Sequence, residues 1–342
     1  MQIKNILILL GSIDEFRKPN VIKNVLIGKK TVSTLYWGMQ YDLNFLFGVM
    51  HNYKFDDINS SLLKLSDQKM ILINDLNEYR LTSKGNVLKK QLAKLMPETN
   101  QKISTNHIDQ FKDRFNLASQ VVSEFSYENN HYYAQKIAFV DEYRVKRWYL
   151  KHKHNLVEPM FQSINNFLKS IDENLADIFI NNLVGHDFLG KSLIQISYEK
   201  QISIDILELI INIMYMNFFN YIISNKIIFF KELIDDLYVK NLVTKSATET
   251  FQIYQNLKDL KLVSKRRSIK ISTVKEHLLE ISILDPRIFP FKDFLNDDLI
   301  NKLNNIFKTN PTITFNEIKT ILTVDFFIFR LYQVFRRQTI EK

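Results

Sequence analysis

The sequence predicts a mainly α-helical, multi-domain protein with one short β-hairpin. Apolar residues recur mostly at the three- and four-residue spacing of helices, and segments with strand-like alternation are few. A length of 342 residues exceeds what one small domain needs. We therefore expect a winged-helix-like domain over residues 1–98, a central helical domain over 99–225 and a C-terminal helix-turn-helix domain over 226–342.

The N-terminal domain shows the element order helix, two short strands, helix. Helical spacing is shown by Ile58, Leu62, Leu63 and Leu65. The expected elements are a helix over 56–68 with Asp56 as N-cap, strands over 70–74 and 78–81, and a helix that continues to about Leu95. This order is typical of a winged-helix unit.

The composition excludes several kinds of active site. The chain has only 7 glycines, no two closer than five residues, which excludes G-x-G dinucleotide loops and G-x-S-x-G nucleophile elbows. Cysteine is absent, so disulfides, cysteine zinc sites and thiol nucleophiles are excluded. No H-E-x-x-H motif or Ser-His-Asp arrangement stands out. We expect no enzyme, no cofactor and no metal.

The longest apolar stretch is expected to be buried in protein. It runs over residues 206–230 and contains six charged or amide side chains, which would each be costly in a membrane. We predict a buried helix pair there. The apolar run at 6–10 is too short to span a membrane, and no small-residue cleavage site follows it. We expect a cytoplasmic, nucleoid-associated protein.

One short motif is formally that of a phosphate loop. Residues 185–192 satisfy G-x-x-x-x-G-K-[ST], but the motif requires a preceding strand, and the residues before it have helical spacing. The segment that follows favours a helix-turn-helix, with helices over 193–200 and 204–215. The second of these is too apolar to lie in a DNA groove. Nucleotide binding through Lys191 and Ser192 is the alternative.

A second helix-turn-helix pattern lies in the last third of the chain. It predicts a helix over 248–260, a short helix or turn over 262–268 and a helix from Ile271 onward with Ser272 as N-cap. In this third helix Val274 and Leu278 are expected to face inward.

Polar residues on the other face of that third helix, and cations before it, are candidate DNA contacts. Recognition helices place polar residues near their N-terminus against base edges, while neighbouring cations bind phosphates. A solvated basic surface is the alternative. With the net charge of +9, we predict as DNA-binding residues Lys265, Arg266, Arg267, Lys270, Ser272, Thr273, Lys275 and His277.

Another basic segment, residues 143–154, has five cations, no acid and three interleaved aromatic residues. Such a segment can stack single-stranded bases or bind an acidic peptide. Alternatively, its apolar residues belong to the core and its cations extend outward. The predicted partner or single-strand contacts are Arg144, Lys146, Arg147 and Trp148.

Three blocks of sequence resemble one known family. They are residues 26–34 with the segment ending at 79–85, residues 130–133 with 141–148, and residues 271–278 with the ending 326–331. In this order they resemble the helicase-associated helix-turn-helix proteins of low-GC Gram-positive bacteria, which are typically encoded beside a RecQ-type DNA helicase.

The resemblance implies an accessory role at replication forks. Residues from about 248 to 335 are similar to helix-turn-helix domains at the C-termini of RecQ-type helicases. The implied partners are a RecQ-type helicase, forked or single-stranded DNA and the acidic tail of single-strand-binding protein, in replication and repair. A helix-turn-helix transcriptional regulator, or a protein–protein adaptor that does not bind DNA, is the alternative.

Overall fold

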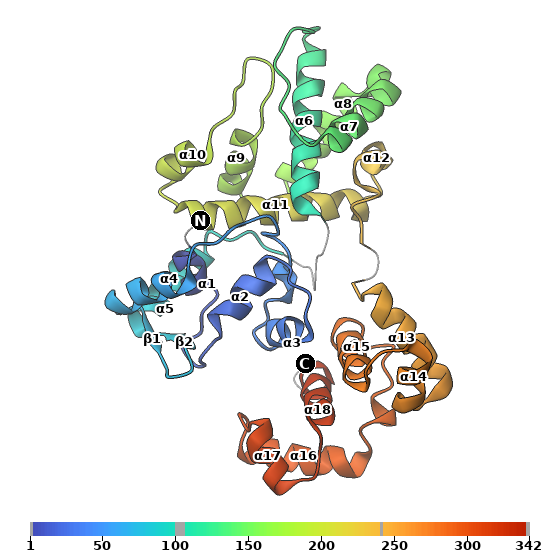
Figure 1. The fold of residues 1–342 in the computed structure, drawn as a ribbon. Helices are drawn as coiled ribbons and strands as arrows, with labels where there is room; N and C mark the ends of the chain where they lie inside the picture. The colour runs from blue at the N-terminus through green and yellow to red at the C-terminus, as the bar shows by residue number, and fades with distance from the viewer. Residues whose placement is uncertain (1–2, 100–106, 240–241, 340–342) are drawn as a thin grey trace. The chain divides into compact units, whose positions relative to one another are not determined.

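The computed structural model describes residues 3–99, 107–239 and 242–339. Within these ranges it contains eighteen α-helices and one two-stranded sheet (Figure 1). The predicted fold class, mainly helical with one hairpin near the N-terminus, is confirmed. The outer ends of the predicted first and third domains, residues 1 and 342, lie outside the described residues.

The chain divides into two compact units. Unit 1 comprises Met1–Lys29 and Asp42–Val239, and unit 2 comprises Lys30–Tyr41 and Lys240–Lys342. Residues 30–41 therefore pack with residues more than two hundred positions later in the chain. The predicted boundaries near 98 and 225 stay predictions.

The first part of unit 1 surrounds the hairpin. Its elements are α1 (Lys4–Leu9), α2 (Pro19–Leu26), the 3-10 turn Asn44–Leu46, α4 (Ile58–Asp67), β1 (Ile71–Ile73), β2 (Tyr79–Leu81) and α5 (Ser83–Ala93). The strands are antiparallel, with Ile71 opposite Leu81. Asp57, and not the predicted Asp56, caps α4, because its carboxylate accepts the N–H groups of Asn59 and Ser60 at 3.2 Å each.

The rest of unit 1 is helical. Its elements are α6 (Ile108–Ser126), α7 (Phe139–His152), the 3-10 turn Lys153–Asn155, α8 (Val157–Leu168), α9 (Glu173–Asn181), α10 (Leu193–Lys200), α11 (Ile204–Ser224), the 3-10 turn Ile228–Phe230 and α12 (Lys231–Ile234). Aromatic rings from α6, α9 and α11 fill its core, with Phe115 4.8 Å from Phe218 and 6.1 Å from Phe179 between ring centroids.

The apolar stretch at 206–230 forms one long helix and not the predicted helix pair. α11 runs for 21 residues and ends at Ser224, where the cap residue Asn225 precedes a turn at Lys226 with φ +51°. By length and composition α11 is long and apolar enough to cross a membrane, and 72% of its most apolar window is buried within the protein. That burial is typical of a core helix.

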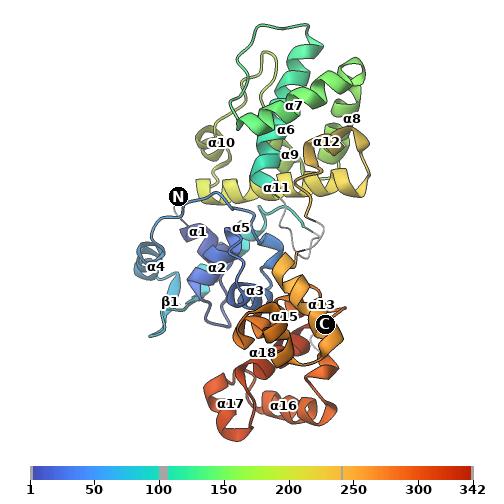
Figure 2. The same cartoon turned by 45° about the vertical axis from the view of Figure 1, so that its right-hand side comes forward.

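Unit 2, in its described residues, is built on seven helices. They are α3 (Val32–Gln40), α13 (Lys245–Leu257), α14 (Leu260–Arg267), α15 (Ile271–Leu284), α16 (Asp297–Thr309), α17 (Phe315–Ile321) and α18 (Phe326–Thr339), with a 3-10 turn at Phe291–Asp293. α15 is central, since α3, α13, α14 and α18 all pack against it (Figure 2). The guanidinium of Arg330 in α18 lies 3.5 Å from the ring centroid of Tyr36 in α3, which joins the two parts of unit 2.

Candidate nucleic-acid interface

Helices α13, α14 and α15 form a three-helix unit in which α14 and α15 are the helix-turn-helix. Asp259 caps α14 by accepting the N–H of Lys261 at 2.7 Å and of Leu262 at 3.0 Å. The N-cap of α15 is Lys270, whose side chain makes no cap hydrogen bond. The prediction that Ser272 is the N-cap is therefore wrong. Because the extended backbone ends at Lys270, Ser272 lies inside the first turn of α15.

The turn between α14 and α15 is closed by local hydrogen bonds. Ser268 has φ +52°, the left-handed conformation that ends many helices. The hydroxyl of Ser264 donates to the carbonyl of Ile269 at 2.5 Å, and the N–H of Ile269 donates to the carbonyl of Ser264 at 3.2 Å. Val263 and Val274 are completely buried beneath the turn. These contacts fix the direction in which α15 leaves the turn.

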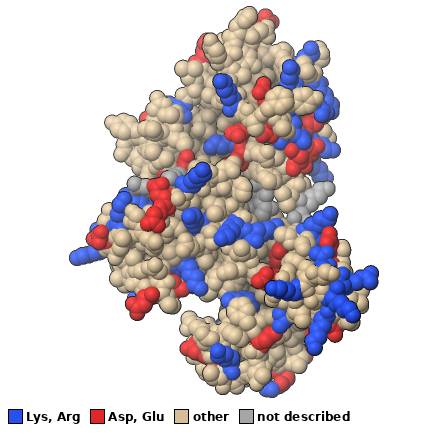
Figure 3. Space-filling view, in the orientation of Figure 1, with Lys and Arg blue, Asp and Glu red and all other residues tan. Residues whose placement is uncertain are grey.

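Four cations on α14 and the turn are exposed. Within the described residues, none of them forms an ion pair. They are Lys261, Lys265, Arg266 and Lys270. In the orientation of Figure 1, Lys and Arg side chains gather over α14 at the lower right (Figure 3). Because Ser272 and Ile271 are also exposed, the N-terminal turn of α15 lies beside this cationic surface and is accessible.

Three other predicted contacts are engaged within unit 2. Arg267 forms an ion pair with Glu249 of α13, and Lys275 forms one with Asp325. The Nδ1 atom of His277 lies 2.8 Å from the Thr250 hydroxyl. Arg267 and His277 thus join α14 and α15 to α13, and Lys275 joins α15 to the residue before α18, so their charge or hydrogen-bonding capacity is already in use. Their contact with DNA stays a prediction, as does that of the half-buried Thr273.

His277 is also held away from its charged form. Burial lowers the pKa of its imidazole, and the nearby Arg267 acts in the same direction. Glu280 and Glu276 oppose this shift. A neutral imidazole does not neutralise a phosphate.

Helices α10 and α11 of unit 1 have the same turn. Gln201 has φ +54°, and the hydroxyl of Ser197 donates to the carbonyl of Ile202 at 2.6 Å. Position by position, residues 193–210 correspond to residues 260–277, and four positions are identical in sequence. These pairs are Leu193 and Leu260, Ser197 and Ser264, Ile202 and Ile269, and Ile204 and Ile271. These four identities at a constant offset are a pattern in the sequence that indicates the geometry shared by the two turns.

The chemistry of the two turns differs. Where unit 2 has Lys265, Arg266 and Lys270, the α10–α11 turn has Tyr198, Glu199 and Ser203. At the position of Ser272 it has Asp205, which is buried and accepts two hydrogen bonds from Asn5, at 3.0 and 3.1 Å. Most of α11 is buried as well. The α10–α11 turn is thus a structural element, as its apolar sequence predicts.

The phosphate-loop match lies in a different structural context from the one that the motif needs. The element directly before the loop at 185–192 is helix α9 and not the strand that the motif requires. Lys191 is paired with Glu199 at 2.6 Å, and Ser192 caps α10. Both side chains that the motif would use for a phosphate and its metal ion are therefore engaged within the protein.

The structure corrects the prediction for Trp148. Its side chain is completely buried, and its indole N–H donates to the carbonyl of Phe229 at 2.8 Å. It is therefore inaccessible to a base or a peptide. Arg144 lies 3.2 Å from Asp236 and 3.7 Å from Asp235, whereas Lys146 and Arg147 are exposed.

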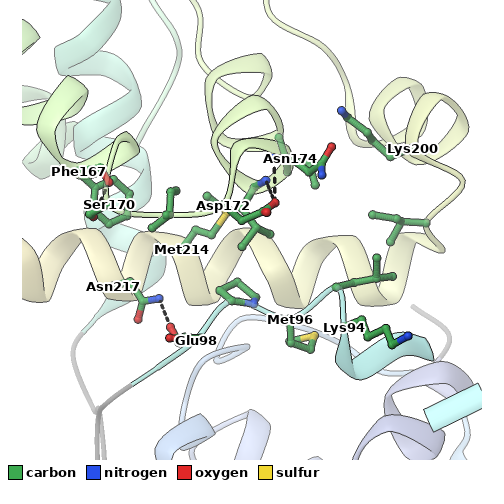
Figure 4. Close-up of a pocket in the computed structure, with 16 residues that line it drawn as sticks. Lys94, Met96, Glu98, Phe167, Ser170, Asp172, Asn174, Lys200, Met214 and Asn217 are labelled. Carbon is green, nitrogen blue, oxygen red and sulfur yellow. Dashed lines mark hydrogen bonds between the residues drawn. The ribbon is translucent and has the colours of Figure 1, made fainter. Parts of the chain in front are cut away.

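Unit 1 also contains a cavity of about 850 Å³ between α11, the segment after α5 and the α8–α9 turn (Figure 4). Two of its polar lining residues are engaged locally. Asn217 donates to the carbonyl of Glu98 at 2.8 Å, and Asp172 caps α9. In the described ranges, no group of three or more metal-ligating residues is placed to hold a metal ion.

Comparison with known proteins agrees with the helix-turn-helix geometry. Residues 246–333, which span α13 to most of α18, match a family described as a helix-turn-helix domain. The chain is also similar to Protein YpbB of Bacillus subtilis (strain 168), with 21% identity over 96% of this chain and 95% of that protein. No solved structure matches the chain.

Proposed function

We propose that this protein is a non-enzymatic DNA-binding accessory protein that partners a RecQ-type helicase in replication or repair. One observation carries the DNA-binding part. Lys265, Arg266 and Lys270 are exposed and lack an ion pair among the described residues, directly beside the accessible N-terminal turn of α15.

This arrangement fits the way in which helix-turn-helix units bind a duplex. The N-terminal turn of α15 enters the major groove, where Ser272 and Thr273 reach base edges. Lys265, Arg266 and Lys270 bind the flanking phosphates. This binding is favourable because the cations displace the counterions that are condensed on those phosphates. The unpaired N–H groups at the start of α15 add a partial positive charge at the same place.

The helicase part of the proposal depends on the family resemblance. A protein with a helix-turn-helix unit and no motor of its own is suited to hold a helicase at a fork. Single-strand-binding protein is the second proposed partner, and the cytoplasmic nucleoid is the proposed location. Co-purification with the RecQ-type helicase, in the presence and absence of forked DNA, tests this part separately from DNA binding.

A transcriptional regulator is the second candidate, since a helix-turn-helix fits both roles. The two differ in sequence preference. A fork accessory protein binds unrelated fork sequences within a few-fold of one another, while a regulator prefers its operator by about a thousandfold or more. A protein–protein adaptor binds the helicase without binding DNA.

The direct test is DNA binding by fluorescence anisotropy with labelled duplex and forked DNA. The triple variant Lys265→Gln, Arg266→Gln, Lys270→Gln should bind more weakly on every sequence. Its log–log salt slope should be less steep by about 0.9 for each phosphate that the variant no longer neutralises. The control is Lys308→Gln with Lys319→Gln, two exposed lysines of α16 and α17. The DNA-binding proposal fails if the triple variant and the control bind equally well.

A further inference from the structure

Unit 1 exposes an aromatic surface on the loop before α7 and on the first turns of that helix. We define this aromatic face as Tyr133, Phe139, Val140 and Tyr143. Their exposed fractions are 100%, 80%, 65% and 56%. Single exposed apolar residues are normal, but four within eleven positions, three of them aromatic, indicate a contact surface.

The backbone that carries the aromatic face is held in place. The side-chain amide of Gln120 in α6 donates to the carbonyl of Tyr133 at 2.9 Å and accepts the N–H of Gln135 at 2.8 Å. Gln120 itself is buried. The loop is thus fixed on both sides of residue 134 while the ring of Tyr133 points into solvent. A ligand that stacks on this ring would meet an already ordered loop.

The start of α7 is held just as firmly. Asp141 accepts a hydrogen bond from the buried Arg114 at 2.6 Å, and both side chains are almost fully buried. Phe139 and Tyr143, which lie two residues to either side of Asp141, are therefore presented on a fixed helix turn. The two rings are therefore exposed because the backbone of this turn is fixed in that position.

Cations without an ion pair in the described residues accompany these rings. Lys136, Lys146 and Arg147 are exposed, and Glu142 is the exposed acid in this segment. Two further cations are neutralised locally, since Arg144 pairs with Asp236 and Lys151 pairs with Glu232. The face therefore carries a surplus of positive charge among flat, accessible rings.

We infer that the aromatic face binds single-stranded nucleic acid, with bases stacked on Tyr133, Phe139 and Tyr143 and phosphates on the neighbouring cations. Aromatic platforms beside unpaired cations are how proteins bind single strands without sequence preference. A duplex keeps its bases stacked on one another and does not offer them to these rings.

An acidic peptide fits this surface less well. The small cavity beside it, about 170 Å³, is lined by Arg144 and Arg147 but also by Glu232 and Asp235. Those two carboxylates repel a peptide carboxylate and a phosphate alike, and Arg144 is already paired, so this cavity does not distinguish the two ligands. The exposed rings themselves offer stacking surfaces and not an enclosed apolar pocket.

The inference does not depend on the helix-turn-helix, so the test uses full-length protein with Lys265→Gln, Arg266→Gln and Lys270→Gln as the background. The probes are a labelled oligothymidylate and an abasic deoxyribose-phosphate oligomer of equal length. We expect the background protein to bind the oligothymidylate more tightly than the abasic oligomer. Adding Tyr133→Ala and Tyr143→Ala should weaken oligothymidylate binding by roughly tenfold or more and abolish the preference over the abasic oligomer.

Matched variants separate stacking from charge and from misfolding. Tyr133→Phe with Tyr143→Phe should retain the preference, because each ring is kept. Lys146→Gln with Arg147→Gln should weaken both oligomers alike. The controls are Tyr198→Ala, an exposed tyrosine on α10, and Lys64→Gln, an exposed lysine on α4, and neither should change binding.

Three results would overturn the inference. One is equal binding of oligothymidylate and abasic oligomer by the background protein. The second is unchanged binding in the Tyr133→Ala, Tyr143→Ala variant. The third is displacement of the oligothymidylate by polyglutamate at similar concentration, which would assign the face to an acidic peptide. Duplex binding by the protein with its intact helix-turn-helix is measured separately, so either hypothesis can fail alone.

Discussion

Arg267 and Glu249 form an ion pair that joins the last turn of α14 to α13. The same guanidinium donates to the Ser246 hydroxyl at 3.0 Å. Its neighbour Arg266 is exposed and has no ion pair with any described residue. Two adjacent arginines thus differ in role, one holding the helix-turn-helix together and the other available to a ligand.

Replacing these two arginines should therefore affect different properties. Arg267→Ala removes a half-buried ion pair and a hydrogen bond, so we expect a loss of about 1–2 kcal/mol in the free energy of unfolding. Arg266→Ala should change that free energy by less than about 0.5 kcal/mol and should weaken DNA binding. Urea unfolding and fluorescence anisotropy measure the two effects. Equal loss of stability in both variants would contradict the assignment.

His277 should make unit 2 sensitive to mild acid. Because burial lowers its pKa in the folded protein, the unfolded chain binds the proton more readily, with a pKa of roughly 6.5. Stability is therefore full above that value and falls as the pH drops through it, until the lowered folded pKa is reached. Thermal unfolding from pH 8 to pH 5 measures this decline. In His277→Gln the decline should be smaller, and an identical pH profile would show that His277 is not its source.

The helix-turn-helix in the last third could be predicted from sequence because its signals are local. Helical spacing and a run of cations both lie within residues 244–284, although the predicted N-cap, Ser272, is wrong. Which of those cations are paired could not be predicted, because Arg267 pairs with Glu249 on a different helix, α13, and Lys275 pairs with Asp325, which lies outside residues 244–284. Whether a cation is paired depends on the packing of other helices.

The sequence also did not predict which aromatic side chains of α7 are buried. Trp148 and Tyr143 lie in the same aromatic and basic segment, yet one is completely buried and the other is 56% exposed. Helical spacing separates them onto different faces of α7, but it does not say which face meets α6 and α12. In the same way, the packing of residues 30–41 with residues 240–342 is a long-range contact that no local pattern reports.

Arg114 should be the least replaceable charged residue of unit 1. It is buried, donates to Asp141 at 2.6 Å and forms two hydrogen bonds with Asp236 at 2.7 and 3.0 Å. Arg114→Met leaves the buried Asp141 without its cation and leaves Asp236 with Arg144 alone, and should cost about 3–5 kcal/mol in the free energy of unfolding. The control Lys146→Met replaces an exposed cation on α7 and should change the free energy of unfolding little.

The same network sets the response of unit 1 to strong acid. The hydrogen bonds from Arg114 hold the pKa of Asp236 below its usual value. This carboxylate therefore contributes stability at neutral pH that is lost as the pH falls below about 3.9 and through the lowered folded pKa. Asp236→Asn should flatten the acid limb of the unfolding curve, as followed by circular dichroism. An unchanged acid limb would show that other carboxylates determine it.

The two matching turns offer a comparison within one chain. Ser264 and Ser197 make the same hydroxyl-to-carbonyl hydrogen bond, at 2.5 and 2.6 Å, at equivalent positions of α14 and α10. Ser264→Ala and Ser197→Ala should each cost about 1 kcal/mol in the free energy of unfolding, because each removes one partly buried hydrogen bond. Only Ser264→Ala should also weaken duplex DNA binding, since that turn directs α15 beside the exposed cations. Weaker duplex binding in Ser197→Ala, at unchanged global fold by circular dichroism, would mean that the α10–α11 turn also contacts DNA.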